Sequence, residues 1–162
     1  MARTELHRTV QPSLLDRLTD LEPEVAADRP TTRDASERDY RAGVQRDVEQ
    51  LLNTRRTIVR PETPLPQLAR SVYAYGIPDT SGLAAAAEST RKELLTSVAD
   101  TLRRFEPRLG DVVVAPRDGE RHALEMRFAI TATLRMDPSP EQIVFDTVVE
   151  VASGTYDVNG TG

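Results

Sequence analysis

The stretch TLRRFEPRL, residues 101–109, decides the fold because the periodicity of the sequence changes there. Before it, apolar residues recur at helical spacing, and from Val112 onward they alternate with polar ones as in β-strands. Pro107 lacks an amide donor and restricts the residue before it, so a helix should end near Phe105 and the chain should continue extended. The order of elements is therefore helices first and strands last.

Glu106 and Arg108 flank this proline with opposite charges. In an extended segment, residues two apart point to the same side, so the two side chains can share a surface. An exposed ion pair usually contributes little to stability. Taken alone, the pair is interpreted as an ordinary surface ion pair.

Residues 105–109 are called the corner below. After the corner, apolar and polar residues alternate most clearly from Leu124 to Met136, where every even-numbered residue is apolar. Three strands are expected, over Val112–Ala115, Leu124–Met136 and Gln142–Ala152. Turn residues separate them, including the hairpin pair Asp118-Gly119. Long strands in a small sheet leave edges on which another chain can dock, which favours an interaction module.

Upstream of the corner, four helical segments are expected. A short amphipathic one contains Leu14 to Leu21 behind Ser13 as a cap. It is too short to be stable alone, so it docks either on its own core or on a partner. The others run from near Ser36 to Asn53–Arg55, through Leu68, Val72 and Tyr75 to a stop at Gly76, and from Ser81 or Gly82 to Phe105.

The predicted fold class is α+β, with N-terminal helices packed on one face of a C-terminal, three-stranded antiparallel β-meander. Residues 1–34 are expected to form an N-terminal segment with the short helix and a linker. Residues 35–153 are expected to form the main domain, and residues 154–162 a flexible tail.

Composition excludes several classes of protein. No apolar run approaches the ~18 residues of a membrane span, and the first residues lack the apolar core of a signal peptide. We therefore expect a cytoplasmic protein without membrane insertion. The net charge of -5 argues against a general nucleic-acid binder. Local basic clusters would suit an acidic protein partner, and they contain Arg55, Arg56, Arg60, Arg103, Arg104 and Arg108.

Motifs for catalysis or cofactor binding are missing from the sequence. Neither His7 nor His122 has a second ligand at metal-site spacing, and the chain has no cysteine, serine elbow or phosphate-binding glycine motif. Among 26 acidic residues some pair at glycosidase separation is expected by chance. With no tryptophan and 4% aromatic residues, little material remains for sugar stacking. We expect no cofactor and no enzyme.

Several motifs in a fixed order resemble one family. They are SLLDRL (13–18), DVEQLLNTRR (47–56), SVYAYGIPD (71–79), FEPRL (105–109) and the alternating strand pair. Together they resemble the TssE family, which contains the baseplate wedge subunits of type VI secretion systems. This family is part of the superfamily of phage baseplate wedge proteins historically labelled lysozyme-like. The resemblance covers residues 13–152, and the combination is far more specific than any one motif.

The resemblance implies a fold similar to the strand-exchange domain of the contractile sheath protein. It also implies a structural adaptor in the baseplate, at the inner face of the cytoplasmic membrane, that helps to start sheath polymerisation. The implied partners are the wedge subunits TssF and TssG, a TssK-containing baseplate, and the sheath proteins TssB and TssC, reached by strand addition along an edge within Leu124–Ala152.

The family's Glu-Pro-Arg signature maps onto Glu106, Pro107 and Arg108, and it is associated with contact to the helical core bundle of the wedge. At a desolvated interface such an ion pair can matter by several kcal/mol. Arg55 and Arg56 of the LLNTRR motif complete the expected partner-binding residues.

Two alternatives remain open at this stage. One is a muramidase-like cell-wall hydrolase, suggested by the family's old label. The other is the wedge protein of a phage tail or another contractile injection system.

Overall fold

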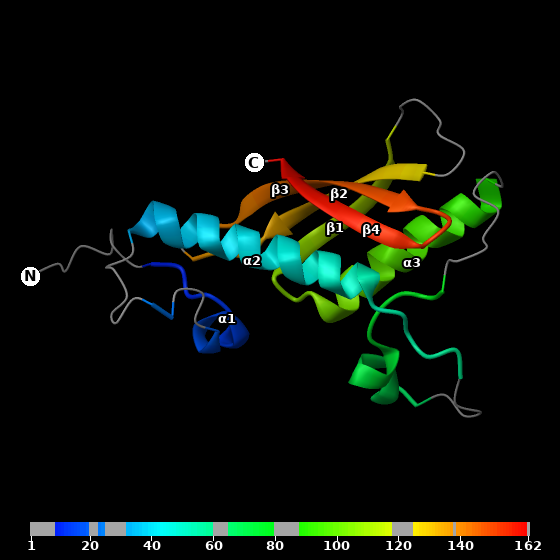
Figure 1. Ribbon diagram of the computed structural model, residues 1–162, viewed down its shortest axis with the longest axis horizontal. Helices are drawn as coiled ribbons and strands as arrows, with labels where there is room; N and C mark the ends of the chain where they lie inside the picture. Colours follow the sequence, from blue (N-terminus) through cyan, green and yellow to red (C-terminus); the bar gives the residue numbers. More distant parts are fainter. Residues whose placement is uncertain are drawn as a thin grey trace, which may run out of the picture. The chain divides into compact units, whose positions relative to one another are not determined.

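A computed structural model describes residues 9–19, 23–24, 32–59, 65–79, 88–117, 125–137 and 139–161. The helical elements are α1 (Leu14–Leu18), α2 (Arg33–Asn53), the 3-10 turns η2 (Leu68–Arg70) and η3 (Val72–Ala74), and α3 (Glu88–Phe105). The strands are β1 (Leu109–Pro116), β2 (Glu125–Leu134), β3 (Glu141–Glu150) and β4 (Thr155–Thr161), as Figure 1 shows. The predicted α+β class is confirmed. The chain divides into two compact units, Met1–Arg46 and Asp47–Gly162.

The sheet of the second unit has four strands in the order β1-β2-β3-β4, and every neighbouring pair is antiparallel. The prediction of three strands is therefore wrong, and so is the prediction that the tail is loose. β4 pairs with β3 from Glu150↔Thr155 to Val144↔Thr161. Its signal in the sequence is weak because Tyr156 and Val158 are the only large apolar residues in it, and turn-forming Asn159 and Gly160 follow them.

The alternation predicted for the second strand is confirmed by burial. Met126, Phe128, Ile130, Ala132 and Leu134 are all buried on one face of β2. Facing residues of the neighbouring strands complete this side of the core, namely Leu109, Val112, Ile143, Phe145, Val149, Tyr156 and Val158. Leu124 lies outside the described residues, and β2 ends at Leu134, two residues before the predicted end.

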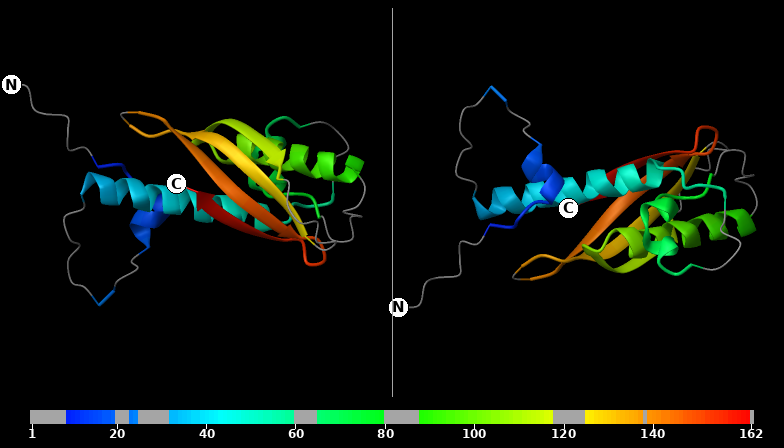
Figure 2. Two further views of the ribbon diagram at one scale, coloured as in Figure 1. Left: turned by 90° about the horizontal axis from the view of Figure 1, so that it is seen from above. Right: turned by 90° about the horizontal axis from the view of Figure 1, so that it is seen from below.

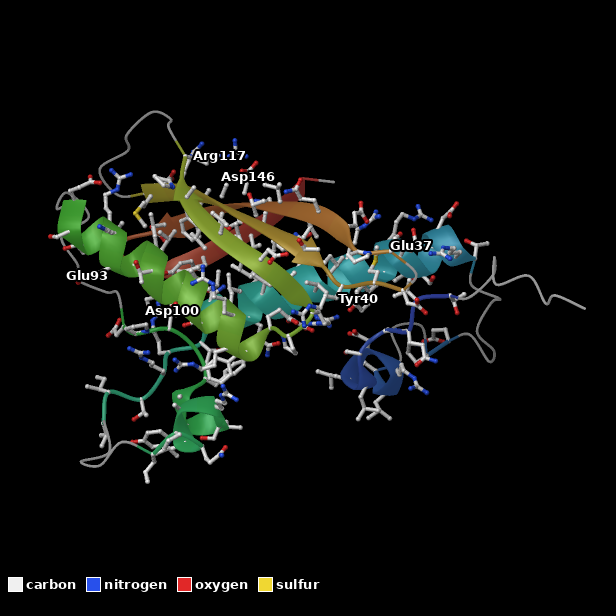
Figure 3. All side chains as sticks on the ribbon, turned by 180° about the vertical axis from the view of Figure 1, so that it is seen from behind. Glu37, Tyr40, Glu93, Asp100, Arg117 and Asp146 are labelled. Atoms are coloured by element: carbon white, nitrogen blue, oxygen red, sulfur yellow. The ribbon has the colours of Figure 1, made fainter. Side chains whose placement is uncertain are left out.

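Helix α3 covers this core face. Seen from above in Figure 2 the sheet lies in front of α3, and seen from below α3 lies in front of the sheet. Its buried stripe contains Leu94, Val98 and Leu102. The predicted start of the helix, at Ser81 or Gly82, lies outside the described residues. The opposite face of the sheet carries more polar side chains, including the ion pair between Arg117 and Asp146 at 2.8 Å (Figure 3).

Two 3-10 turns replace the single short helix expected around Leu68 to Tyr75. Ser71 separates them because its backbone is extended (φ -95°, ψ 172°) and its hydroxyl accepts the amide of Tyr73. The predicted stop at Gly76 is confirmed. Its φ is +94°, and a Cβ there would lie 2.3 Å from the carbonyl oxygen of Thr54.

The edges of the sheet are β1 and β4, because β2 and β3 are paired on both sides. The expectation of a free edge within Leu124–Ala152 is therefore wrong. On β4, Asn53 from the end of α2 accepts the amide of Tyr156 at 2.9 Å and donates to its carbonyl at 2.8 Å. On β1, Arg103 donates to the carbonyl of Val112 at 2.8 Å. Side chains thus cover part of each edge.

In the first unit, Ser13 caps α1 as predicted. Its hydroxyl accepts the amide of Asp16, whose carboxylate accepts the Ser13 amide in return. Arg46 donates to the same carboxylate at 2.5 Å and ties α1 to α2. None of the residues of α1 is buried, and Leu14, Leu15 and Leu18 are all more than 60% exposed.

Helix α2 begins at Arg33, three residues before the predicted start. Thr32 supplies the cap, because its hydroxyl accepts the amide of Ala35. Ser36, near which the helix was expected to begin, is buried inside the first turn and donates to the carbonyl of Arg33.

Candidate functional site

The corner between α3 and β1 is a β-turn rather than the extended segment that was expected. The amide of Glu106 still donates to the carbonyl of Leu102, at 2.9 Å, and the amide of Leu109 donates back to the carbonyl of Glu106, at 3.1 Å. Pro107 therefore occupies the second position of the turn, where its fixed φ is favoured. This geometry brings the side chains of Glu106 and Arg108 together.

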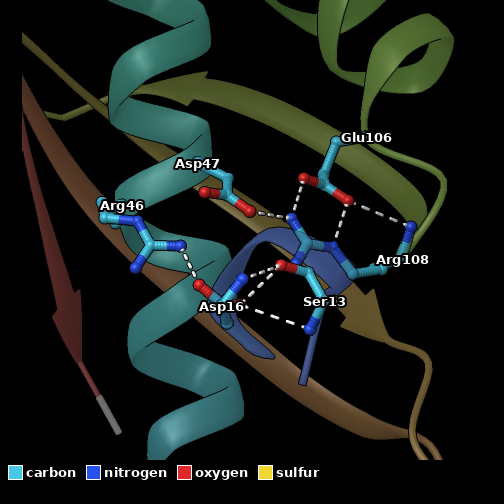
Figure 4. Close-up of polar contacts among 6 residues, drawn as sticks. All are labelled: Ser13, Asp16, Arg46, Asp47, Glu106 and Arg108. Carbon is cyan, nitrogen blue, oxygen red and sulfur yellow. Dashed lines mark hydrogen bonds and ion pairs between the residues drawn. The ribbon is translucent and has the colours of Figure 1, made fainter. Parts of the chain in front are cut away.

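Arg108 is the centre of a three-residue network (Figure 4). Its Nε and Nη2 donate to the two carboxylate oxygens of Glu106, at 2.7 and 2.5 Å. Nη2 also donates to Oδ2 of Asp47 at 2.7 Å. The network joins α2 to the corner through one guanidinium, and the two-point contact with Glu106 fixes the plane of that group.

The network is largely shielded from solvent. The side chains of Glu106, Arg108 and Asp47 are 6%, 20% and 24% exposed. The hydrogen bonds to Glu106, followed by those to Asp47 and both charges, raise the pKa of Arg108 against the opposing effect of burial. The interpretation of Glu106 and Arg108 as an ordinary surface ion pair is therefore wrong, because the turn draws both side chains inward.

A tyrosine extends this cluster. The ring of Tyr75 packs edge-on against Phe105, with ring centroids 5.4 Å apart. Burial, and then the charges of Asp47 and Glu106, raise the pKa of its hydroxyl. The end of η3, the end of α3 and the carboxylates of the network thus form one continuous patch.

The other predicted partner-binding residues lie in different surroundings. Pro107 is exposed at the tip of the turn. Arg55 donates to the carbonyl of Gly154 at 2.5 Å and lies 3.7 Å from the carboxylate of Asp79. Arg56 donates its backbone amide to Ile77 and lines a hollow beside η2. The structure therefore brings Glu106 and Arg108 together, whereas Arg55 supports the β3–β4 turn.

Sequence reasoning missed Asp47 and Asn53. Asp47 opens the DVEQLLNTRR motif, but it lies 61 residues before Arg108, and no spacing rule connects the two. Asn53 lies inside the same motif, immediately before Thr54, where the helix ends. An amide at a helix end favours a cap, and this general preference gave no reason to expect contact with a strand.

The carboxylate of Glu106 is engaged within the protein. Both oxygens of Glu106 accept hydrogen bonds from Arg108, and the residue is 5% exposed. Within the described ranges, no three histidine or acidic side chains gather closely enough to hold a metal ion. His7 and His122 lie outside these ranges. None of the described helices is long and apolar enough to cross a membrane.

The second unit is thus an α+β unit with an ion-paired corner between α3 and β1. We compared the chain with known protein families. The family model described as "Baseplate wedge protein gp25" matches residues 38–139, which is more than half of the chain and includes Asp47, Glu106 and Arg108. The chain belongs to this family of structural baseplate proteins. No curated protein and no solved structure matches it.

Membership confirms the resemblance noted in the sequence. It supports a structural role in a phage or type VI secretion baseplate, with contacts to other baseplate proteins, and it is compatible with the absence of enzymatic activity.

Proposed function

We propose that the protein is a TssE-type subunit of a type VI secretion baseplate. In this role it links the core bundle of the wedge to the first sheath ring and helps to initiate sheath polymerisation. The observation that carries the proposal is the Glu106–Arg108–Asp47 network, because it presents the family's Glu-Pro-Arg signature on a rigid corner within a chain that belongs to the wedge family.

The corner suits the wedge core bundle as a partner. Arg108 is held by Glu106 and Asp47 before any partner arrives, so little side-chain entropy is lost on binding. Pro107 stands exposed beside it and adds a rigid apolar surface. A small, ordered surface with a charged centre and an apolar tip is typical of a protein–protein anchor. TssF and TssG are the wedge subunits that this anchor would bind, within a TssK-containing baseplate.

The sheath contact is proposed along the edge of β1. This strand pairs only with β2, and Pro116 marks the end of the exposed ladder, as is usual on edge strands. Val113 on β1 is 57% exposed, although it is apolar. A strand from TssB or TssC added here would make main-chain hydrogen bonds and cover this side chain.

The muramidase alternative is disfavoured by the surroundings of Glu106. A glycosidase acid must reach the substrate and needs a second carboxylate across a solvent-filled cleft. Glu106 is buried, its two oxygens accept from Arg108, and Asp47, the other carboxylate of the network, accepts from that same guanidinium. The second alternative, a wedge protein of a phage tail or other contractile system, has the same structural role. Neighbouring genes distinguish it from a type VI protein.

In the proposed role the protein acts at the cytoplasmic side of the membrane. The test is sheath assembly in cells that carry the complete secretion gene cluster. Deleting the gene should abolish fluorescent sheath foci, and the wild-type gene should restore them. Normal foci in the deletion strain would contradict the proposal, and wall-degrading activity of the purified protein would then support the hydrolase.

A further inference from the structure

Five of the six large apolar side chains that are exposed in the described part of the second unit gather in one place, and the sixth, Val113, lies on β1. Large apolar side chains are usually well buried, and an exposed cluster of them marks an interaction surface. Five lie around the 3-10 turns, namely Ile58 (84% exposed), Val59 (70%), Leu65 (53%), Val72 (89%) and Tyr73 (39%). Figure 3 shows this part of the chain beneath the labelled Asp100 of α3.

Three of them, Val59, Leu65 and Tyr73, line a groove of about 500 Å³. Its apolar lining consists of Val59, Leu65, Pro66, Leu68, Ala69, Tyr73 and Ala74. The hydroxyl of Tyr73 donates to the carbonyl of Val59 at 2.6 Å and joins the two sides. The groove is therefore a built feature, with side chains from η2, η3 and the segment after α2.

The rim of the groove is basic. Arg56 and Arg104 line it, and Arg104 also lines an adjoining hollow with Arg70, Arg103 and Asp100. Arg103 pairs with Asp100 at 3.2 Å. Within the described ranges, Arg70 and Arg104 have no carboxylate partner, and Arg104 donates only to the carbonyl of Ala69, at 3.3 Å. The groove thus combines an apolar floor with the positive charges of Arg70 and Arg104, with which no described carboxylate pairs.

The apolar floor and the basic rim of the groove together indicate which class of partner it binds. The groove is built from 3-10 turns and a helix and offers no strand edge, so main-chain pairing cannot supply the contact. An amphipathic helix fits instead, with its apolar stripe in the groove and its acidic residues facing the arginines. The groove also adjoins the corner, since Tyr73 and Ala74 line it while Tyr75 packs on Phe105.

We propose that this arginine-rimmed groove binds an acidic amphipathic helix of a baseplate wedge subunit, as a second contact beside the Glu106-Pro107-Arg108 corner. The inference rests on the proposed function, because the partner is one of the wedge subunits that the corner would bind. Beyond the proposed function, the inference specifies the segment of the partner that binds. This segment is a helix with large aliphatic residues on one face and Asp or Glu beside them.

The test is binding of purified variants to the reconstituted complex of TssF and TssG. The double reversal Arg70→Glu and Arg104→Glu should weaken binding by about tenfold or more, and Ala69→Trp, which fills the groove without a charge change, should weaken it too. The matched control reverses Arg117 and Arg127, which pair with Asp146 and Glu125 on the other sheet face. Circular dichroism verifies that each variant is folded.

A photo-crosslinking residue at Leu65, which lines the groove and is 53% exposed, identifies the occupant in the same complex. Crosslinks to an acidic helical segment of TssF or TssG support the inference. Wild-type affinity of the groove variants would overturn it while the proposed function stands, and so would crosslinks to a second copy of this chain. Failure of the wild-type protein to bind would overturn both the inference and the proposed function.

Discussion

Arg108 and Asp47 lie 61 residues apart in the sequence and are joined by a hydrogen bond of 2.7 Å between Nη2 and Oδ2. Through this bond the last turns of α2 are coupled to the corner where α3 passes into β1. The same guanidinium satisfies both oxygens of Glu106. Arg108 therefore links α2 to the corner in the free protein, and with Glu106 it also forms the proposed anchor.

We predict that Arg108→Ala lowers the free energy of unfolding by about 2–4 kcal/mol, because it leaves the buried carboxylate of Glu106 without its counter-ion. Urea unfolding followed by circular dichroism measures the loss. Arg127→Ala is the control, since it removes an exposed pair with Glu125 and should cost less than about 1 kcal/mol. Equal stability of the two variants would contradict the structural role of Arg108.

Tyr75 should make the protein less stable in alkali. Burial, together with the charges of Asp47 and Glu106, raises its pKa above the ordinary value of 10.0. Its contribution is fully present below that value and is lost as the pH rises through the higher pKa of the folded state. Between about pH 9 and 11, wild-type protein should lose more stability than Tyr75→Phe. Denaturant titrations measure the free energy of unfolding of both proteins. Equal losses of stability in wild type and Tyr75→Phe would contradict the raised pKa of Tyr75.

Gly76→Ala should destabilise the protein by about 2–4 kcal/mol. The φ of +94° disfavours any residue with a Cβ, and the added carbon would overlap the carbonyl of Thr54. Gly110→Ala is a matched control, because its Cβ would meet no atom closer than 3.5 Å. Melting temperatures should fall for the first variant and change little for the second. A similar fall in both would argue against a special role of Gly76.

Val113→Lys should block the proposed sheath contact without loss of wedge binding. A lysine on an edge strand opposes the addition of another strand. Val113 is exposed, so the fold should tolerate the change. Its register partner Thr131, on the central strand β2, gives the control Thr131→Lys on the same face. Sheath foci in cells should disappear for the first variant only, and foci in both would rule out the β1 edge.

The sequence predicted the elements whose pattern is local. The alternation in β2, the end of α3 at Phe105 and the turn residue Gly76 each depend on neighbours within a few positions, and all three are confirmed. β4 was missed because its pairing with β3, rather than its own composition, stabilises it. The assignment of an edge to the strands within Leu124–Ala152 failed for the same reason, since the added strand makes β3 internal.

The site was predicted in part. Glu106 and Arg108 were found through the family signature, and their proximity follows from a spacing of two residues. Asp47 and Asn53 were missed because their partners, Arg108 and Tyr156, are 61 and 103 residues away. Contacts over such separations depend on the packing of α2 in the folded unit, and no local rule encodes them.

The most direct test of the central claim is quantitative binding of wild-type, Arg108→Ala and Arg127→Ala proteins to TssF–TssG. It should be done at a temperature where circular dichroism shows all three to be folded. Wild type and Arg127→Ala should bind alike, whereas Arg108→Ala should not bind. Equal binding by the folded Arg108→Ala protein would contradict the claim that the Glu106-Pro107-Arg108 corner is the anchor to the wedge.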